Sequence, residues 1–153
     1  MKKKLVIIDG NAIIHRAYHA IPPLTNKNGQ LVNAVYGFTS MLLKVWNQLQ
    51  PEYLAVTFDM PGKTFRHEKF EDYKATRVKA DQELYDQIPL VHEVVEAFNM
   101  PIYEKAGYEA DDVIGTIAKQ VKDVETFIVT GDMDILQLVD KNTKAFTMRK
   151  GIN

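Results

Sequence analysis

The sequence predicts an α/β protein with a doubly wound, mainly parallel central sheet flanked by helices. Short apolar runs alternate with longer stretches in which apolar residues recur at helical spacing. This alternation is typical of β-α-β units built on a parallel sheet. Three of the apolar runs are followed by an aspartate, namely Asp9, Asp59 and Asp132. Because parallel strands end at one edge of the sheet, where such folds bind ligands, we expect a site there.

Length and composition indicate one compact domain. The chain has 153 residues, of which 46% are hydrophobic and 25% charged, as in ordinary globular proteins. The formal net charge of -1 does not indicate nucleic-acid binding, so only the distribution of charge could do so. The absence of cysteine excludes disulfide scaffolds and thiolate zinc sites. No apolar run is long enough for a signal peptide or a membrane span, so we expect a cytoplasmic protein with no membrane partner.

The first strand and helix are expected near the N-terminus. Leu5–Ile8 is a continuous, mostly β-branched apolar run, which is typical of a strand buried on both faces. A helix should follow over Ala12–Ala20, with Asn11 as its N-cap, and Pro22 should prevent its continuation.

A second helix is expected over Ala34–Gln48, capped by Asn33. Its apolar stripe has helical period and includes Phe38 and Trp46, so both aromatic side chains should lie in the core. The second strand should cover Tyr53–Phe58.

The second half of the chain should contain a long helix over Glu83–Asn99 with Phe98 inward. Pro89 predicts a kink in it, or a junction of two helices. A short strand at Pro101–Tyr103 and a helix opening at Gly107–Asp112 should follow.

The last elements lie around a third acid-ended strand. Phe127–Val129 is its apolar run, and a helix is expected to continue through Val139. A final strand should cover Thr143–Met148.

Seven carboxylates are expected at or near the carboxyl edge of this sheet. They are Asp9, Asp59, Glu109, Asp111, Asp112, Asp132 and Asp134. One acid at a helix start has a simple explanation, because it complements the helix dipole. Three acid-ended strands plus a triplet within one turn are harder to explain in that way. Like charges a few Å apart repel by about 1 kcal/mol per pair even in water, so the cluster needs cations.

The candidate ligands indicate which cations. All are oxygen donors, which suits Mg²⁺ or Mn²⁺ better than Zn²⁺. So many carboxylates favour two ions per site, roughly 3.5–4 Å apart, a common arrangement for phosphodiester cleavage.

Other phosphate-handling motifs fit less well. Gly62-Lys63-Thr64 resembles the end of a phosphate-binding loop, but Thr57 stands where the first glycine is required. A dehalogenase-type phosphatase would need further motifs after Asp134, where little sequence remains. A phospho-receiver domain would need an acidic pair where this sequence has Asp9-Gly10.

The segment from Lys63 to Lys79 combines cations with aromatic residues. Its cations are Lys63, Arg66, Lys69, Lys74, Arg77 and Lys79, and its rings are Phe65, Phe70 and Tyr73. Cations that track phosphates and rings that stack on bases are typical of surfaces for single-stranded nucleic acid. The alternative is a solvated helix face with its rings packed inward. Beside an acidic metal site, the phosphate-binding interpretation is the better one.

Several motifs together resemble one family, the 5′-nuclease (5′-3′ exonuclease) domains of bacterial DNA polymerase I, in the flap-endonuclease and PIN-like superfamily. The resemblance is to the N-terminal part of that domain. The matching stretches, in family order, are Ile8–Asn11, Ala34–Phe38, Phe58-Asp59 with Phe65–Glu68, Tyr73-Lys74 with Arg77, Gly107–Asp112 and Thr130–Asp134.

The resemblance implies a PIN-like fold and a role for each site residue. All seven acids would bind metal, directly or through water. Lys74 and Arg77 would be catalytic, at the base of a helical arch or clamp over about 60–88, where they contact the scissile phosphate. His15 stands where the family stacks a ring on a base, and Arg16 matches a phosphate contact. With the basic segment, the expected DNA-binding residues are His15, Arg16, Lys63, Arg66, Lys69, Tyr73, Lys74 and Arg77.

The function implied is metal-dependent, structure-specific 5′-nuclease activity on DNA in primer removal and repair. Substrates would be 5′ flaps, branched or nicked duplexes and single-stranded 5′ ends, and the chain would continue covalently into a polymerase. Family members continue into a helix–three-turn–helix DNA-binding module, so residues 1–153 are expected to be a truncated catalytic domain. Two alternatives stay open: a truncated DNA-binding module with little or no turnover, and a PIN-type ribonuclease.

Overall fold

The computed structural model of the chain, which describes residues 2–70, 72–76 and 79–147, is built on a five-stranded sheet in which all pairings are parallel. The strand order is β3-β2-β1-β4-β5. The strands are β1 (Lys3–Asp9), β2 (Tyr53–Thr57), β3 (Ile102–Tyr103), β4 (Val124–Val129) and β5 (Thr143–Phe146). The predicted doubly wound α/β class is therefore confirmed.

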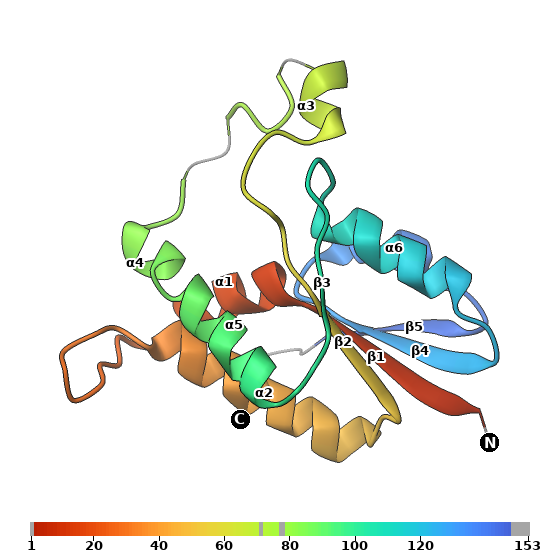
Figure 1. The fold of residues 1–153 in the computed structure, drawn as a ribbon, viewed down its shortest axis with the longest axis horizontal. Coiled ribbons are helices and arrows are strands. Elements are labelled where there is room, and N and C mark those ends of the chain that lie inside the picture. Colours follow the sequence, from red (N-terminus) through yellow and green to blue (C-terminus); the bar gives the residue numbers. More distant parts are fainter. Residues whose placement is uncertain (1, 71, 77–78, 148–153) are drawn as a thin grey trace.

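Helices cover both faces of the sheet (Figure 1). They are α1 (Gly10–Ala20), α2 (Asn33–Leu49), α3 (Phe65–Lys69), α4 (Gln82–Tyr85), α5 (Ile88–Ala97), α6 (Ala110–Gln120) and the 3-10 helix η1 (Met133–Leu138). None of the helices in the described ranges is long and apolar enough to cross a membrane.

Alternate residues of the central strand serve two separate cores, as the two-residue period of a strand requires. Val6 and Ile8 of β1 pack with the cluster formed by α1, α2 and α5. Leu5 and Ile7 pack on the opposite face with Ile114 of α6 and with η1. The strand is thus buried on both faces, which explains its unbroken apolar sequence.

Helix α1 begins earlier than expected, and its N-cap is Asp9 rather than Asn11. The Asp9 carboxylate accepts a hydrogen bond from the Ala12 backbone N–H at 3.1 Å. The acid that ends β1 therefore also starts α1. Gly10, between strand and helix, has no room for a side chain, because a Cβ there would lie 2.2 Å from Phe58 Cε1.

Two expectations for α2 are wrong. Asn33 is the first helical residue, and its side chain donates to the Tyr18 and Ile21 carbonyls instead of capping α2. Phe38 is buried as expected, but Trp46 is 49% exposed, because the stripe is wider than the face that α2 packs against the sheet.

The expected helix over Glu83–Asn99 is two helices, α4 and α5, with Pro89 in the first turn of α5, where a missing N–H costs nothing. Phe98 follows α5 and is 46% exposed, so its predicted inward position is wrong. The stretch expected to be helical after Asp134 is the short 3-10 helix η1, and β5 ends at Phe146.

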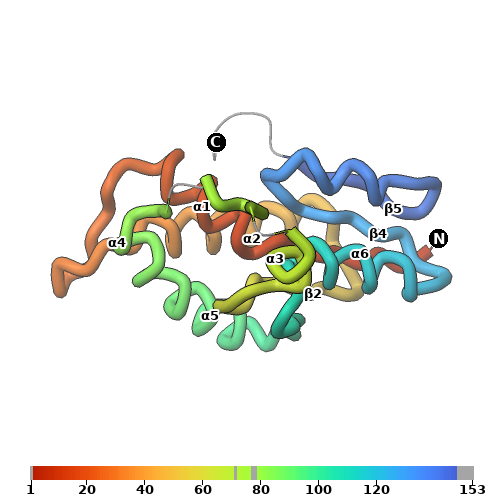
Figure 2. Tube along the Cα trace, turned by 90° about the horizontal axis from the view of Figure 1, so that it is seen from above, coloured from red at the N-terminus to blue at the C-terminus, as the bar shows by residue number. Residues whose placement is uncertain are grey.

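The described parts of the chain between β2 and α5 rise beyond the carboxyl end of the sheet (Figure 1). We refer to residues 60–88 as the 60–88 segment. Seen from above, its helix α3 lies near the start of α6 (Figure 2). This segment therefore stands over the sheet edge at which the acids were expected.

Candidate active site

The acids predicted at the sheet edge come from four segments of the chain. Asp9 ends β1, and Asp59 lies two residues beyond β2. Glu109 is the N-cap of α6, and Asp111 lies in its first turn. Asp132, three residues beyond β4, is the N-cap of η1. These five, and not Asp112 or Asp134, line one cavity of about 770 Å³.

Asp9 is the innermost of these acids, at 4% exposure. Its Oδ1 accepts the Ala12 N–H, and its Oδ2 accepts the Thr130 hydroxyl at 2.7 Å. Burial raises the pKa of Asp9, the two hydrogen bonds oppose that rise, and the charges of Asp59 and Asp132 add to it. The group is thus held in one orientation but carries its charge at a cost.

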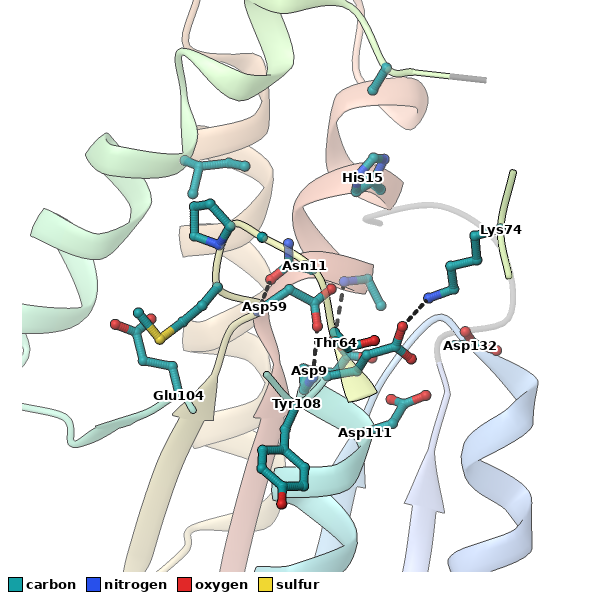
Figure 3. A pocket seen from close by; sticks show the side chains of 18 of the residues that line it. Asp9, Asn11, His15, Asp59, Thr64, Lys74, Glu104, Tyr108, Asp111 and Asp132 are labelled. Carbon is teal, nitrogen blue, oxygen red and sulfur yellow. Dashed lines mark hydrogen bonds and ion pairs between the residues drawn. The ribbon is translucent and has the colours of Figure 1, made fainter. Parts of the chain in front are cut away.

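Asp59 is fixed by neighbours on both of its sides. Its backbone N–H donates to Asn11 Oδ1 at 2.9 Å. Its own Oδ1 accepts the Ala110 N–H, at the start of α6, at 2.6 Å. Asn11 and α6 therefore hold Asp59 beside the first strand (Figure 3).

The pKa of Asp111 is sensitive to the other acids of the cavity. Burial first, and then the charges of Asp9, Asp132, Asp59 and Glu109, raise its pKa from 3.8 to about 6. Each of these four acids is thus close enough to disfavour another negative charge. The cavity carries excess negative charge, which a bound cation would relieve.

Two cations of the 60–88 segment, Lys74 and Arg66, lie against the acid Glu109. Lys74 Nζ donates to Glu109 Oε1 at 2.8 Å, and the Tyr73 hydroxyl donates to Glu109 Oε2 at 3.1 Å. The Arg66 guanidinium lies 3.7 Å from Glu109 Oε2. Figure 3 shows Lys74 reaching toward the acids, on the side where Asp111 and Asp132 lie. The predicted catalytic lysine is thus brought to the acidic site.

Asp112 and Asp134 are placed differently from the other five acids. Both oxygens of Asp112 accept hydrogen bonds from Arg66, and Oδ2 also accepts the Glu109 N–H. The Arg66 hydrogen bond is the main reason that the pKa of Asp112 lies below its usual value. Asp134 is exposed, and its N–H donates to Asp132 Oδ1 at 2.9 Å. Their predicted metal-ligand roles remain predictions.

The other expected DNA-binding residues lie around the cavity and on α3. His15 lines the cavity, and Arg16 is next to it on α1. Arg66 and Lys69 lie over the Phe65 ring, 4.6 and 5.7 Å from its centroid. Lys63 is exposed just before α3. Arg77 lies outside the described residues.

The donors suit a hard divalent cation in an open site. All five cavity acids offer oxygen, and burial together with the charges of the other four raises the pKa of Asp111. Among the described residues, no three acid or histidine side chains are spaced to enclose an ion by themselves. Mg²⁺ usually keeps several waters and takes one or two carboxylates plus phosphate oxygens, so an open arrangement fits it.

Two residues that orient the acids were missed as site residues. Thr130 bonds to Asp9 and to the Asp132 N–H, and Asn11 bonds to the Asp59 N–H. Both belong to motifs that carry the family resemblance. Their contacts join distant segments, and sequence spacing alone does not show them.

Comparison with known proteins agrees with this geometry. Residues 4–153 match the model of the family described as "5'-3' exonuclease, N-terminal resolvase-like domain". DNA polymerase I of Caldicellulosiruptor bescii is 50% identical over 141 residues, which are 91% of this chain and 17% of that protein. A 5'-3' exonuclease of Aquifex aeolicus is 42% identical over 142 residues, which are 92% of this chain and 49% of that protein.

A similar fold occurs in a solved nuclease. The crystal structure of a bacteriophage T5 flap endonuclease, described as a pseudo-enzyme-product complex with DNA and metal ions, superposes with a TM-score of 0.77. The match covers 95% of this chain and 55% of that one, at 17% identity, so it is a likeness of fold. The chain thus spans about a sixth of the polymerase and about half of each nuclease.

Proposed function

Because the chain belongs to the 5′-3′ exonuclease N-terminal, resolvase-like domain family, we propose that it forms the catalytic part of a metal-dependent, structure-specific 5′-nuclease acting on DNA. The observation that carries the proposal is the convergence of five carboxylates from four segments at one sheet edge, beside Lys74. An acidic site with a lysine at its rim suits a phosphodiester, whose charge a cation and the lysine would share.

The cofactor would be Mg²⁺ or Mn²⁺, with two ions per site. Asp9, Asp59, Glu109, Asp111 and Asp132 would hold them, since these acids line the cavity. Bound there, the ions would supply an activated water and neutralise charge on the phosphate and leaving oxygen. Asp112 and Asp134 would act at most through water or through their neighbours.

The chain's own residues would bind and orient the DNA. Lys74 lies where it can turn from Glu109 to a phosphate oxygen, and Arg77 would support it from the same segment. Tyr73 and His15 would present rings to bases, and the remaining cations would track the backbone. They are Arg16, Lys63, Arg66 and Lys69.

The wider biological setting is part of the same proposal. We propose that the chain continues covalently into a polymerase, which its similarity to DNA polymerase I supports. A role in primer removal and repair is part of this proposal. The substrates we propose are 5′ flaps, nicked or branched duplexes and single-stranded 5′ ends, and the description of the solved T5 protein as a flap endonuclease in complex with DNA supports this proposal. A cytoplasmic location would follow from such a role in a bacterium.

The experiment is cleavage of an end-labelled 5′-flap DNA with Mg²⁺ and with chelator. We expect Mg²⁺-dependent cutting that Asp132→Asn reduces at least about 100-fold, since it removes a cavity carboxylate. Asp140→Asn is the control, because that exposed acid lies before β5, away from the cavity. The chain should be assayed both as it stands and extended as in its relatives.

Three results would count against the proposal. Absence of cutting by both forms, or equal cutting by Asp132→Asn, would overturn it. Faster cutting of an RNA strand than of the DNA flap would favour a ribonuclease.

A further inference from the structure

Thr130 contacts two of the cavity acids without contributing a charge and without lining the cavity itself. It follows β4 directly, is 1% exposed, and joins two of the acids through one hydroxyl. Its Oγ1 lies 2.7 Å from Asp9 Oδ2 and accepts the Asp132 backbone N–H at 2.9 Å. The hydroxyl therefore connects the end of β1 to the turn that carries Asp132.

The direction of these two bonds is fixed by chemistry. A backbone N–H can only donate, so Thr130 Oγ1 must be the acceptor of the Asp132 contact. The single hydroxyl proton is then available for Asp9, whose carboxylate accepts it. Because Oδ1 of Asp9 accepts the Ala12 N–H, hydrogen bonds hold both of its oxygens. The plane of the carboxylate is thereby set, with its remaining lone pairs available to a ligand.

We propose that Thr130 is a positioning residue that aims the Asp9 carboxylate and the Asp132 turn at a divalent cation. The inference rests on the proposed function, because it takes Asp9 and Asp132 as ligands of that cation. When a residue that hydrogen-bonds to a metal ligand is removed, metal affinity typically falls by about 10- to 100-fold. The alternative is that Thr130 only fills the end of β4.

The chain provides a matched control in Thr57. It ends β2 as Thr130 follows β4, and it is 0% exposed. Its hydroxyl also donates a hydrogen bond, but to the Ile8 carbonyl at 3.2 Å rather than to an acid. Thr57→Val and Thr130→Val therefore each remove one buried hydroxyl at a strand end and keep the side-chain shape. Only Thr130→Val removes a hydrogen-bond donor from an acid of the site, namely the donor to Asp9 Oδ2.

The experiment measures Mn²⁺ affinity by electron paramagnetic resonance, with thermal unfolding of the metal-free chain alongside. We expect Thr130→Val to weaken Mn²⁺ binding about 10-fold or more, and Thr130→Ser to restore it. Thr57→Val should lower the melting temperature to a similar extent but bind Mn²⁺ within about 2-fold of the original chain.

Three outcomes would overturn the inference. They are unchanged Mn²⁺ affinity in Thr130→Val, an equal loss in Thr57→Val, and no Mn²⁺ binding by the original chain. Flap cleavage, measured separately, distinguishes this inference from the proposed function. If Thr130-dependent Mn²⁺ binding occurs while neither the chain as it stands nor its extended form cuts DNA, Thr130 keeps its role and the nuclease proposal fails. If flaps are cut while Thr130→Val binds Mn²⁺ normally, only the positioning role fails.

Discussion

The Arg66 guanidinium and the Asp112 carboxylate face each other through two hydrogen bonds, Nη1 to Oδ2 at 2.6 Å and Nη2 to Oδ1 at 2.7 Å. This geometry pairs two planar groups and is among the stronger arrangements of a protein ion pair. The pair joins α3 in the 60–88 segment to the first turn of α6. Because Asp112 also accepts the Glu109 N–H, the same carboxylate links the segment to a cavity acid.

A double-mutant cycle with Arg66→Ala and Asp112→Ala should show this coupling. We expect a coupling free energy of about 1 kcal/mol between the two residues, because the ion pair is bidentate and partly shielded from water. Their side chains are 29% and 21% exposed. Urea unfolding of the four chains gives the coupling energy directly.

The control cycle is Lys144→Ala with Glu125→Ala, an ion pair between β5 and β4 whose side chains are 53% and 30% exposed. We expect a coupling of roughly 0.5 kcal/mol or less there, as for most surface pairs. If the Arg66–Asp112 coupling is no larger than this, the pair does not fasten α3 to α6.

Asp111 should give the metal-free chain a pH-dependent stability. Its pKa is about 6 in the folded chain and 3.8 ordinarily, so the folded state binds the proton more tightly between those values. Stability from this group is therefore greatest at low pH and is lost as the pH rises through about 6. We expect Asp111→Asn to raise the melting temperature at pH 7.5 and to flatten the decline of the melting temperature between about pH 4 and pH 6. The pKa of Asp9 is also raised, so some decline of the melting temperature with rising pH should remain in Asp111→Asn.

Metal binding should show the complementary dependence, because protons and cations compete for Asp111. Mn²⁺ affinity should fall as the pH drops below about 6. Asp111→Asn should weaken Mn²⁺ binding most above that pH, where the carboxylate is charged, and should flatten the pH dependence. Asp112→Asn, next along α6 but outside the cavity, should weaken Mn²⁺ binding less. Equal losses in the two variants would show that Asp112 is as much a ligand as Asp111.

Lys69 allows a test of the cationic surface on α3. It is exposed, with its ammonium over the Phe65 ring, and is not among the residues that line the acidic cavity. If it contacts one phosphate, Lys69→Ala should reduce the salt dependence of DNA binding by about 0.7 to 0.9 in log–log slope. Lys122→Ala is the control, because Lys122 lies between α6 and β4, at the far end of the sheet. Equal slopes in Lys69→Ala and the original chain would place Lys69 off the DNA.

The sheet and its acidic edge could be predicted because they follow from local sequence. Buried parallel strands need contiguous apolar residues, and Leu5–Ile8 lies within β1 as expected. The acids that follow the strands then share an edge by topology alone. Spacing could not say which of seven acids face the cavity, since that depends on where α6 and η1 start.

Other features depend on partners far away in the chain. Arg66 and Asp112 are 46 residues apart, so the sequence shows a cation and an acid without showing the pair. The mistaken cap at Asn33 has a similar cause. An asparagine before a helical pattern is a good local cap, but a buried side chain from a distant turn takes that role here.

That side chain is Gln87, between α4 and α5. Its Oε1 accepts the Ala34 N–H at 2.8 Å, and its Nε2 donates to Asn33 Oδ1 at 3.1 Å and to the Glu83 carbonyl. At 1% exposure, none of these groups has water as a ready substitute. Gln87→Leu should therefore cost roughly 2 to 4 kcal/mol in the free energy of unfolding, because polar groups are left buried without partners.

The control for Gln87 is Gln48→Leu, an exposed glutamine in the last turn of α2. That change should alter stability by no more than about 0.5 kcal/mol. Gln87→Glu keeps the oxygen that caps α2 but loses the amide donor to Asn33. Its loss of stability should therefore lie between those of Gln48→Leu and Gln87→Leu. If Gln87→Leu cost no more than Gln48→Leu in urea unfolding, the start of α2 would be capped in solution by another group. The turn that ends the 60–88 segment would then lack this anchor to α2.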